Sequence, residues 1–363
     1  MTYDYLIVGA GFAGCVLAER LASQLGKKVL MIDRRSHIGG NAYDSIDEHG
    51  IRIHHYGPHL FHTNDDSIIK YLSQFTSWYQ YEHRVLASVN GSLVPMPVNR
   101  TTVNTLFGLN FTTEDEVKAF YEREKESISF IRNSEDVVVS KVGRRLYNLL
   151  YKGYTTKHWG VEPSHLAPSV CGRLPIRTNT NDRYFDDRFQ MMPAHGYTEM
   201  FNNMTIHPLI SVEINTDFKD IPSGAFNRLI FTGPIDEYFQ QTFGALPYRS
   251  LRFDFETHEK EFVQSVAQVN YPNDFAYTRS IEFKHITGQH QSKTTIAKEY
   301  SRETGEPYYP IPNDENEALY KLYAAEAKKL KTVQFVGRLA TYRYYNMDQV
   351  VAQALKIFED IAN

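Results

Sequence analysis

Three features are scarce in this 363-residue sequence: cysteine, excess positive charge and long apolar runs. Its only cysteines, Cys15 and Cys171, are too few for a disulfide framework, so a reducing compartment fits. The formal net charge of −4 argues against nucleic acid as the main partner, because nucleic-acid binding needs a broad basic surface. No apolar run is long enough to span a membrane, and the chain opens without a basic leader. We therefore expect a cytoplasmic protein that binds neither nucleic acid nor membrane.

Aromatic residues, in contrast, are abundant: the chain has 25 tyrosines and 22 phenylalanines. Tyrosine combines a stacking face with a polar tip that needs a partner when it is buried. Four closely spaced histidines, His54, His55, His59 and His62, raise the question of a zinc site. No cysteine or ordered set of acids completes a ligand set beside them, so we expect no bound metal.

The first 33 residues predict a β-α-β unit that binds a dinucleotide. A short apolar strand leads into GAGFAG, an amphipathic helix follows, and KVLMID forms the second strand. Gly9 permits a tight turn, Gly11 lets the backbone approach a pyrophosphate, and Gly14 allows helix and strand to pack closely. Asp33 at the end of the second strand can bind ribose hydroxyls. In this strand-turn-helix context the pattern is a strong signal.

Further along the chain, helical patterns and then short alternating strands predict a discontinuous architecture. We expect an α/β protein with a Rossmann-like dinucleotide-binding domain, a helical insert and an antiparallel β-sheet domain. The expected boundaries are 1–77 with 205–245 and 316–363 for the dinucleotide-binding domain, 98–170 for the helical domain, and 78–97 with 171–204 and 246–315 for the β-sheet domain.

The segment GYTTKHWG, residues 153–160, follows a helical pattern and lies between two glycines. Gly153 occupies the position of a left-handed helix cap, so we expect the helix to end there and a mobile segment to begin. The alternative is a surface loop whose Trp159 packs against a neighbouring wall.

Several motifs together resemble one family. DRRSHIGGNAYD places a double glycine after the ribose-binding acid, as in FAD-binding flavoproteins of the amine-oxidase and Rab-GDI superfamily. Along nearly the whole chain follow YGPHLFHT, GYTTKHWG, GRLPIR, RYFDDRFQ, TGPIDEYF, YRSL, YTRSIE, EPYYP and GRLATYRYYNMDQV. In this order they resemble the UDP-galactopyranose mutase family.

This resemblance implies a redox-neutral isomerase that interconverts the pyranose and furanose forms of a nucleotide sugar, with reduced FAD as the nucleophile. It also implies an external reductant such as NAD(P)H or a reductase, a homodimer, and a role in making galactofuranose for cell-surface polysaccharides. UDP-galactopyranose is the first expected substrate. TDP-fucopyranose or another nucleotide hexose is the second.

The resemblance also assigns roles to individual residues. For catalysis it implies Arg173 and Arg279, which bind the diphosphate, and His62 near the flavin ring. For substrate binding it implies Tyr154, Trp159, Tyr184, Asn270, Tyr309, Tyr344, His83 and Asn346, with Tyr154 and Trp159 on a mobile lid. For the cofactor it implies Gly39, Gly40, Asn41, His59, Arg338 and Met347, besides Gly9, Gly11, Gly14 and Asp33.

Two of these positions depart from the family pattern. His83 stands where the family commonly has asparagine, and Asn346 stands where it has aspartate. An amide in place of a carboxylate adds a hydrogen-bond donor, which could change the preferred sugar or be neutral. Outside this reaction class, the alternatives are a flavin amine or alcohol oxidase and a GDI-like binding module without flavin.

Overall fold

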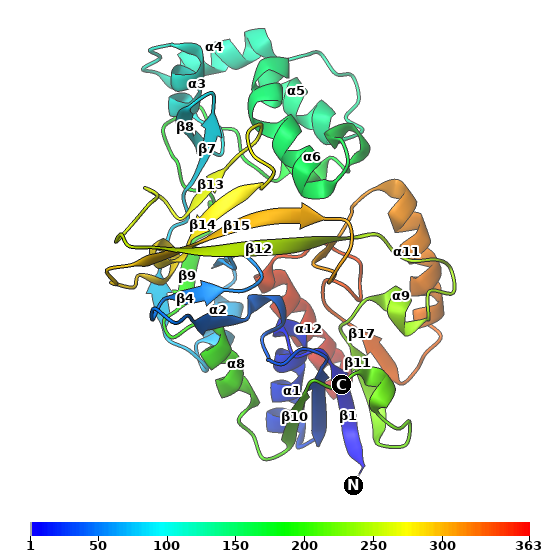
Figure 1. Ribbon diagram of the computed structural model, residues 1–363. Helices are drawn as coiled ribbons and strands as arrows, with labels where there is room; N and C mark the ends of the chain where they lie inside the picture. Colours follow the sequence, from blue (N-terminus) through cyan, green and yellow to red (C-terminus); the bar gives the residue numbers. More distant parts are fainter. Residues whose placement is uncertain (1) are drawn as a thin grey trace.

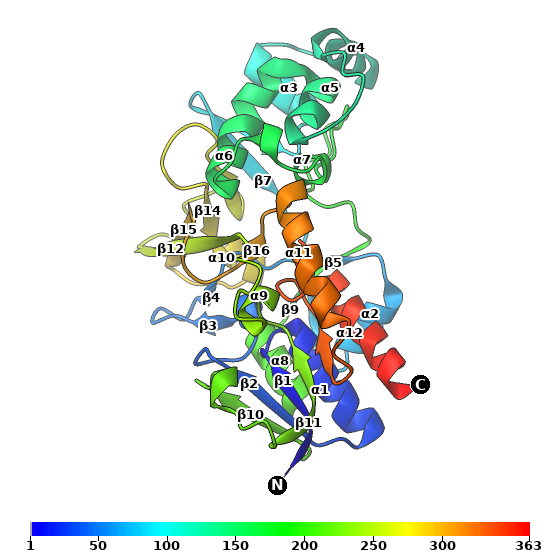
Figure 2. The same cartoon turned by 90° about the vertical axis from the view of Figure 1, so that its right-hand side faces the viewer.

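The computed structural model describes residues 2–363, which form three stacked layers (Figure 1). A parallel sheet with its helices lies at the bottom, a long, mainly antiparallel sheet crosses the middle, and a group of helices lies at the top. Figure 2 shows the same stacking from the side, with two helices near the C-terminus, α11 (Asp314–Ala327) and α12 (Met347–Ala362), along one flank.

The bottom layer is a five-stranded parallel sheet in the order β10-β2-β1-β11-β17. Its strands are β1 (Tyr3–Val8), β2 (Val29–Asp33), β10 (Ile210–Ile214), β11 (Phe226–Phe231) and β17 (Val333–Phe335). Helix α1 (Phe12–Leu25) ends at Gly26, whose φ of 61° is the left-handed cap that the sequence predicts. Strands from both ends and the middle of the chain thus meet in one sheet, as expected for a discontinuous Rossmann-like domain.

Helices α12 and α8 (Tyr197–Thr205) pack against α1 and bury the main apolar core. The division into domains stays a prediction, with one correction. Most of α8 falls within 171–204, which the sequence assigns to the β-sheet domain, yet its Met200, Phe201 and Met204 are buried in the core around α1. The spacing of these apolar residues indicates an amphipathic helix with one buried face, but it does not indicate which part of the fold that face packs against.

The middle layer is a seven-stranded sheet in the order β16-β12-β15-β14-β13-β7-β8. Its strands are β7 (Val85–Val89), β8 (Ser92–Met96), β12 (Tyr248–His258), β13 (Gln268–Asn270), β14 (Arg279–Glu282), β15 (Thr294–Arg302) and β16 (Tyr309–Pro310). All pairings are antiparallel except that of β13 with β7. The alternating segments LRFDFETH and KTTIAKEY belong to the two longest strands of this sheet, β12 and β15, which pair with each other.

Smaller elements join these two sheets. Two short sheets have the orders β3-β4 and β5-β9-β6, from β3 (Asp44–Ile46), β4 (Arg52–His54), β5 (Phe61–Thr63), β6 (Trp78–Gln80) and β9 (Phe189–Pro193). The remaining helices outside the top layer are α2 (Asp66–Leu72), α9 (Ile235–Tyr238) and α10 (Phe283–Thr287).

The top layer consists of α3 (Arg100–Phe107), α4 (Glu114–Glu124), α5 (Ser134–Leu146), the π-helical turn η2 (Tyr147–Lys152), α6 (Gly153–Trp159) and α7 (Ser169–Gly172). Thr113 caps α4 in a capping box with Glu116, the signal that FTTEDE carries. Helix α5 is kinked at Gly143, where φ is 82° and a Cβ would lie 2.0 Å from the carbonyl oxygen of Glu124. This layer and strands β7 and β8 share a second apolar core.

The segment GYTTKHWG is a helix, so the predicted break at Gly153 is wrong. Gly153 has helical angles (φ −63°, ψ −42°), and the left-handed cap is Gly160 with φ 73°. A Cβ on Gly153 would lie 2.4 Å from the carbonyl oxygen of Pro272. Gly153 is therefore required for the close approach of another segment and not for chain reversal, a distinction that no local pattern carries.

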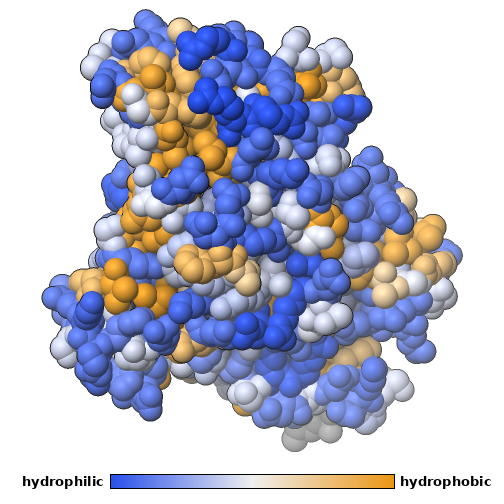
Figure 3. Space-filling model, turned by 45° about the horizontal axis from the view of Figure 1, so that its top comes forward, coloured by the Kyte–Doolittle hydropathy of each residue, from blue (hydrophilic) through white to orange (hydrophobic). Residues whose placement is uncertain are grey.

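The described helices include none with the length and apolarity that a membrane crossing requires. The face in Figure 3 is largely hydrophilic, and its apolar residues form separate patches.

Candidate functional site: a dinucleotide cavity next to an arginine and tyrosine cluster

A cavity of about 710 Å³ lies at the carboxyl ends of β1 and β2, where the glycine turn meets α1. Gly9 has φ +102°, which a side chain would strain. A Cβ on Gly14 would lie 1.9 Å from the carbonyl oxygen of Gly9, so only glycine fits there. At Gly11 the nearest atom to such a Cβ is the Cα of Gly40, 3.6 Å away, so this glycine leaves room for a ligand at the helix N-terminus. The residues present fit a dinucleotide.

Asp33 lines the cavity and also shapes the turn. Its two carboxylate oxygens accept hydrogen bonds from the backbone N–H groups of Ala10 and Arg35, each at 2.9 Å. Only 8% of Asp33 is exposed, so its side chain is held toward the cavity wall. The predicted acid at the end of the second strand therefore lies at the wall of the cavity, and its contact with a ribose stays a prediction.

The other predicted cofactor residues all line this cavity: Gly39, Gly40, Asn41, His59, Arg338 and Met347. Gly39 and Gly40 both have positive φ, 96° and 55°, which explains the glycine pair. Burial lowers the pKa of His59 to about 3, so its imidazole is neutral at physiological pH. Arg338 is anchored by its guanidinium, which donates to the carbonyl oxygen of Tyr345 at 2.5 Å.

A second group of predicted residues lies next to Arg338, which also lines the cavity. The guanidinium of Arg338 lies 5.3 Å from the ring centre of Tyr344, and that of Arg173 lies 4.8 Å from the same ring. Burial would raise the pKa of the Tyr344 phenol, but the charges of the two arginines more than offset this, and its pKa lies below the usual value. The three side chains form a positively charged junction between the cavity and the cluster beyond it.

Aromatic rings from α6 and β16 form one wall of this cluster. The rings of Trp159, Tyr309 and Tyr344 are mutually in contact, with centres 5.3–5.5 Å apart and edge-to-face angles. Trp159 is only 4% exposed. Of the two readings of GYTTKHWG, the structure therefore shows a tryptophan packed on a neighbouring wall, on a helix and not on a loop, and the predicted mobility of the segment stays a prediction.

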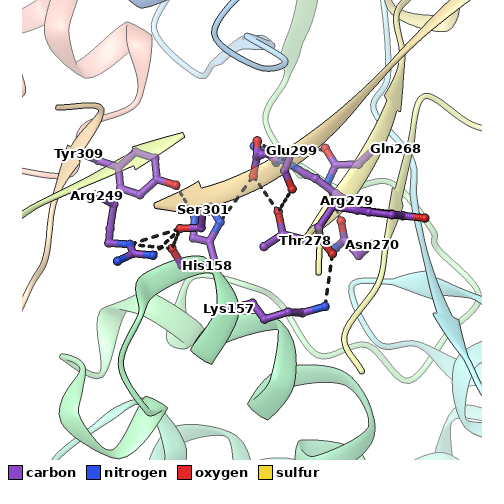
Figure 4. Close-up of polar contacts among 11 residues, drawn as sticks. Lys157, His158, Arg249, Gln268, Asn270, Thr278, Arg279, Glu299, Ser301 and Tyr309 are labelled. Atoms are coloured by element: carbon purple, nitrogen blue, oxygen red, sulfur yellow. Dashed lines mark hydrogen bonds and ion pairs between the residues drawn. The ribbon is translucent and has the colours of Figure 1, made fainter. Parts of the chain in front are cut away.

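Arg279 lies on the opposite side of the cluster and is held by a buried acid (Figure 4). Its Nε and Nη2 donate to Oε2 of Glu299 at 2.9 and 2.6 Å, and its Nη1 donates to Oε1 of Gln268 at 3.3 Å. Burial lowers the pKa of Arg279, but the Glu299 charge raises it above its ordinary value overall, so the guanidinium stays charged. Three of its five N–H groups are used, which leaves donors for a ligand.

Asn270 and His83 lie near Arg279 in the fold, since β13 pairs with both β14 and β7. Asn270 lies directly opposite Arg279 in the strand register. Its Oδ1 accepts a hydrogen bond from Nε2 of Gln268 at 2.8 Å. Burial lowers the pKa of His83 to about 3, with a further contribution from the Arg279 charge, so His83 is neutral. Its ring meets the ring of Tyr184 edge-on at 5.6 Å.

Two predicted residues lie apart from the core of the cluster. His62 does not line the cavity; its Nδ1 is 2.7 Å from a carboxylate oxygen of Asp187 and its ring stacks on Phe185 at 3.7 Å. Asn346 is the exposed N-cap of α12. Capping alone accounts for an asparagine at this position.

The four neighbouring histidines have different partners. His54 accepts from the backbone N–H of His59, His55 contacts Ser45 Oγ, His59 contacts the carbonyl oxygen of Gly57, and His62 contacts Asp187. Within residues 2–363, no group of three or more histidine, cysteine, aspartate or glutamate side chains is arranged to hold a metal ion.

The sequence analysis missed three residues of the cluster: Glu299, Arg249 and His158. Glu299 is fully buried, and Arg249 donates to the carbonyl oxygen of His158 at 3.2 Å and to Ser301 Oγ at 2.7 Å. The ring of His158 contacts Tyr309 Oη at 2.9 Å. The only local signal was that of Glu299, an acid on the same strand face as Thr295 and Ala297 in KTTIAKEY.

The fold and the site together define a class: a protein with a Rossmann-like dinucleotide cavity and an adjoining cluster of arginines and tyrosines suited to an anionic ligand. Residues 149–344 match the family model for UDP-galactopyranose mutase, and residues 7–75 match an NAD(P)-binding Rossmann-like domain. Among curated proteins, the chain is similar to a probable UDP-galactopyranose mutase of Klebsiella pneumoniae, with 39% identity over 98% of this chain and 94% of that protein. It is also similar to a dTDP-fucopyranose mutase of Escherichia coli, with 35% identity over 97% and 96%.

Among solved structures, that of a reduced UDP-galactopyranose mutase matches with a TM-score of 0.79 at 16% identity, over 100% of this chain and 94% of that one. The chain belongs to the UDP-galactopyranose mutase family. It is an isomerase of the mutase type, and it shares the fold of the reduced UDP-galactopyranose mutase structure.

Proposed function

We propose that this enzyme interconverts the pyranose and furanose forms of a nucleotide sugar, with UDP-galactopyranose as the first candidate substrate, and that it is active with reduced FAD. The observation that carries the proposal is the junction of Arg173, Tyr344 and Arg338. It places an anion-binding cluster directly at one end of the dinucleotide cavity. A nucleoside diphosphate bound there would hold its sugar next to the cofactor.

The charges of the cluster support a diphosphate ligand. Arg173, Arg249, Arg279 and Arg338 contribute four positive charges, and the buried carboxylate of Glu299 offsets one of them. The histidines add none, because burial holds the pKa of His83 to about 3 and that of His158 well below its usual range. Guanidinium groups and tyrosine hydroxyls are the donors best suited to phosphate oxygens in a closed site.

When bound, reduced FAD would supply the nucleophile for the anomeric carbon. The chain's own residues then have three tasks. Arg173 and Arg279 stabilise the diphosphate as it leaves and returns, Tyr184, Tyr309 and Tyr344 orient it, and the aromatic wall around Trp159 excludes water. We further propose that a reductant such as NAD(P)H or a reductase keeps the flavin reduced, and that the enzyme acts as a cytoplasmic homodimer supplying furanose sugars for cell-surface polysaccharides.

A second candidate substrate is dTDP-fucopyranose, since the chain is also similar to a dTDP-fucopyranose mutase and one residue of the proposed site departs from the family pattern. His83, which departs from the family pattern, is buried against Tyr184, and its Nδ1 is 3.0 Å from Tyr81 Oη. A neutral imidazole held this rigidly imposes a different hydroxyl pattern from an asparagine. We propose that His83 affects sugar preference more than Asn346 does, because Asn346 is exposed and caps α12.

The decisive experiment uses purified enzyme reduced with dithionite and incubated with UDP-galactopyranose, dTDP-fucopyranose and other nucleotide sugars. NMR should show a furanose product of unchanged mass, and activity should disappear when the flavin is reoxidised in air. Turnover by oxidised enzyme with stoichiometric peroxide would instead establish an oxidase. If dTDP-fucopyranose is isomerised and UDP-galactopyranose is inert, only the first-ranked sugar is wrong, and His83→Asn should then shift the preference toward UDP-galactopyranose.

A further inference from the structure

Lys157 on α6 makes an unusual set of contacts. Its ammonium lies within hydrogen-bonding distance of four backbone carbonyl oxygens of one loop, those of Tyr271, Asp274 (3.0 Å), Phe275 (3.1 Å) and Tyr277 (3.3 Å), which share its three N–H donors. Across residues 2–363, no acidic side chain forms an ion pair with it. Partial burial lowers the pKa of Lys157, so the carbonyl oxygens must compensate for lost hydration of the charge.

The loop that Lys157 holds, residues 271–278, joins β13 to β14. The residues at its two ends are Asn270 and Arg279, which face each other across the strand pair. Both belong to the proposed substrate site. The position of the loop therefore bears on two site residues, one on each strand, and Figure 4 shows Lys157 reaching from α6 toward this strand pair.

Two further contacts fasten the same loop to the same helical segment. Asn273 Nδ2 donates to the carbonyl oxygen of Leu149 at 2.9 Å. At Gly153 the helix approaches so closely that a Cβ would lie 2.4 Å from the carbonyl oxygen of Pro272. Within the loop, the rings of Tyr271, Phe275 and Tyr277 pack on one another, and Phe275 at its tip is 62% exposed with a φ of +44°.

The two residues after Lys157 dock on other parts of the site. The carbonyl oxygen of His158 accepts hydrogen bonds from Arg249 on β12 and Ser301 on β15, and Trp159 packs against Tyr309. Three consecutive residues of α6 thus contact the loop 271–278 and the strands β12, β15 and β16. The C-terminal end of α6 therefore links these elements to one another.

We infer that Lys157 is a positioning residue: its ammonium fixes the loop 271–278 on α6 and so holds Asn270 and Arg279 in the geometry that binds the nucleoside diphosphate. The inference rests on the proposed substrate site. It assigns a role to a charged residue that does not itself contact the ligand. A lysine suits this role because its compact ammonium can donate to several convergent carbonyl oxygens, whereas a planar guanidinium cannot.

The test compares Lys157→Met with Lys152→Met as a matched control. Lys152 lies one turn earlier, is half exposed, and faces Glu162 at 3.7 Å. Lys157→Met should weaken UDP and dTDP binding, measured by calorimetry, about tenfold or more, with flavin content and unfolding temperature close to those of the control. Backbone amides of 271–278 should also exchange hydrogen faster. Equal affinities of the two variants would overturn the inference.

Asn273→Ala provides a second variant that loosens the loop from its own side, through an exposed residue. It should weaken nucleotide binding in the same direction, by a smaller factor of about two to five, and it keeps the inference testable if Lys157→Met does not fold. Wild-type affinity in Asn273→Ala, together with unchanged exchange of 271–278, would count against the role of the loop. If the wild-type protein itself binds neither UDP nor dTDP, the proposed substrate site is wrong, a result distinct from failure of the Lys157 inference.

Discussion

The two halves of the site are built in different ways. The glycine turn between β1 and α1 offers backbone N–H groups within a short stretch of chain, and its shape depends on the absence of side chains at Gly9 and Gly14. The arginine and tyrosine cluster offers side chains from widely separated segments, each held by its own partner, such as Glu299 for Arg279. A single added Cβ in the turn should therefore abolish dinucleotide binding. Removing side chains from the cluster one at a time should instead reduce activity in steps.

The largest effect is expected at Gly14. Gly14→Ala adds a Cβ that would lie 1.9 Å from the carbonyl oxygen of Gly9, a backbone atom that cannot rotate away. We expect a loss of at least about 1–3 kcal/mol in the free energy of unfolding together with loss of bound flavin, measured by thermal unfolding and absorbance. Gly224→Ala is the control, because nothing lies within 4 Å of its Cβ position. Full flavin content in Gly14→Ala would mean that the turn tolerates side chains.

The next effect is expected at the arginines. If these arginines bind the leaving diphosphate as proposed, Arg173→Ala and Arg279→Ala each remove charged hydrogen bonds worth about 1.5–3 kcal/mol, so kcat/KM should fall about 10- to 150-fold. Flavin content should stay unchanged, since neither residue lines the dinucleotide cavity. Arg228→Ala, on the exposed part of β11, is the control. Near-normal turnover by either site variant would show that the diphosphate binds elsewhere.

Acid stability should show that the dinucleotide half depends on a buried neutral histidine. Burial lowers the pKa of His54 to about 4, below the ~6.5 of an unfolded chain, so the unfolded state takes up the proton first as pH falls. The stability that His54 contributes is complete above about pH 6.5 and is lost progressively toward pH 4, about 2 kcal/mol by pH 5.

The variant His54→Asn keeps an acceptor near the position of Nδ1, which binds the His59 N–H, and cannot be protonated. Urea unfolding at pH 7.5 and 5 should therefore show a smaller loss of stability in this variant than in the wild type. His290→Asn, at an exposed position, is the control. An equal loss in the wild type and His54→Asn would assign the acid sensitivity to other groups.

The smallest effect is expected at Trp159. Trp159→Phe keeps an aromatic ring but weakens the contacts with Tyr309 and Tyr344, each worth about 0.5–1.5 kcal/mol, so nucleotide affinity should fall about 2- to 10-fold. Flavin content should not change. Trp78→Phe, on β6, is the control. Trp159 is the tryptophan that remains in this variant, so a change in its fluorescence on addition of UDP would show that binding affects Trp159. A UDP affinity equal to that of Trp78→Phe would reduce Trp159 to a packing residue.

Local signals were sufficient for several elements. The β-α-β unit, the caps at Gly26 and Thr113, and the start of α12 at Met347 depend on interactions within a few residues. Gly153 shows where such signals mislead. A glycine after a helical pattern usually ends the helix, but here the helix continues, because the reason for the glycine is the carbonyl oxygen of Pro272 in a distant loop.

By itself, the sequence determined the dinucleotide turn and, through its motifs, the identities of most residues of the arginine and tyrosine cluster. It did so because a tight turn requires glycine at particular positions, and because arginine and tyrosine are residue types suited to binding phosphate. Only the tertiary structure decided which of these side chains meet and what holds them. The pairing of β14 with β15 brings Glu299 to Arg279, and the approach of α6 brings Lys157 to the loop 271–278. Contacts between segments so far apart along the chain follow from strand register and helix packing, which no local pattern of residues specifies.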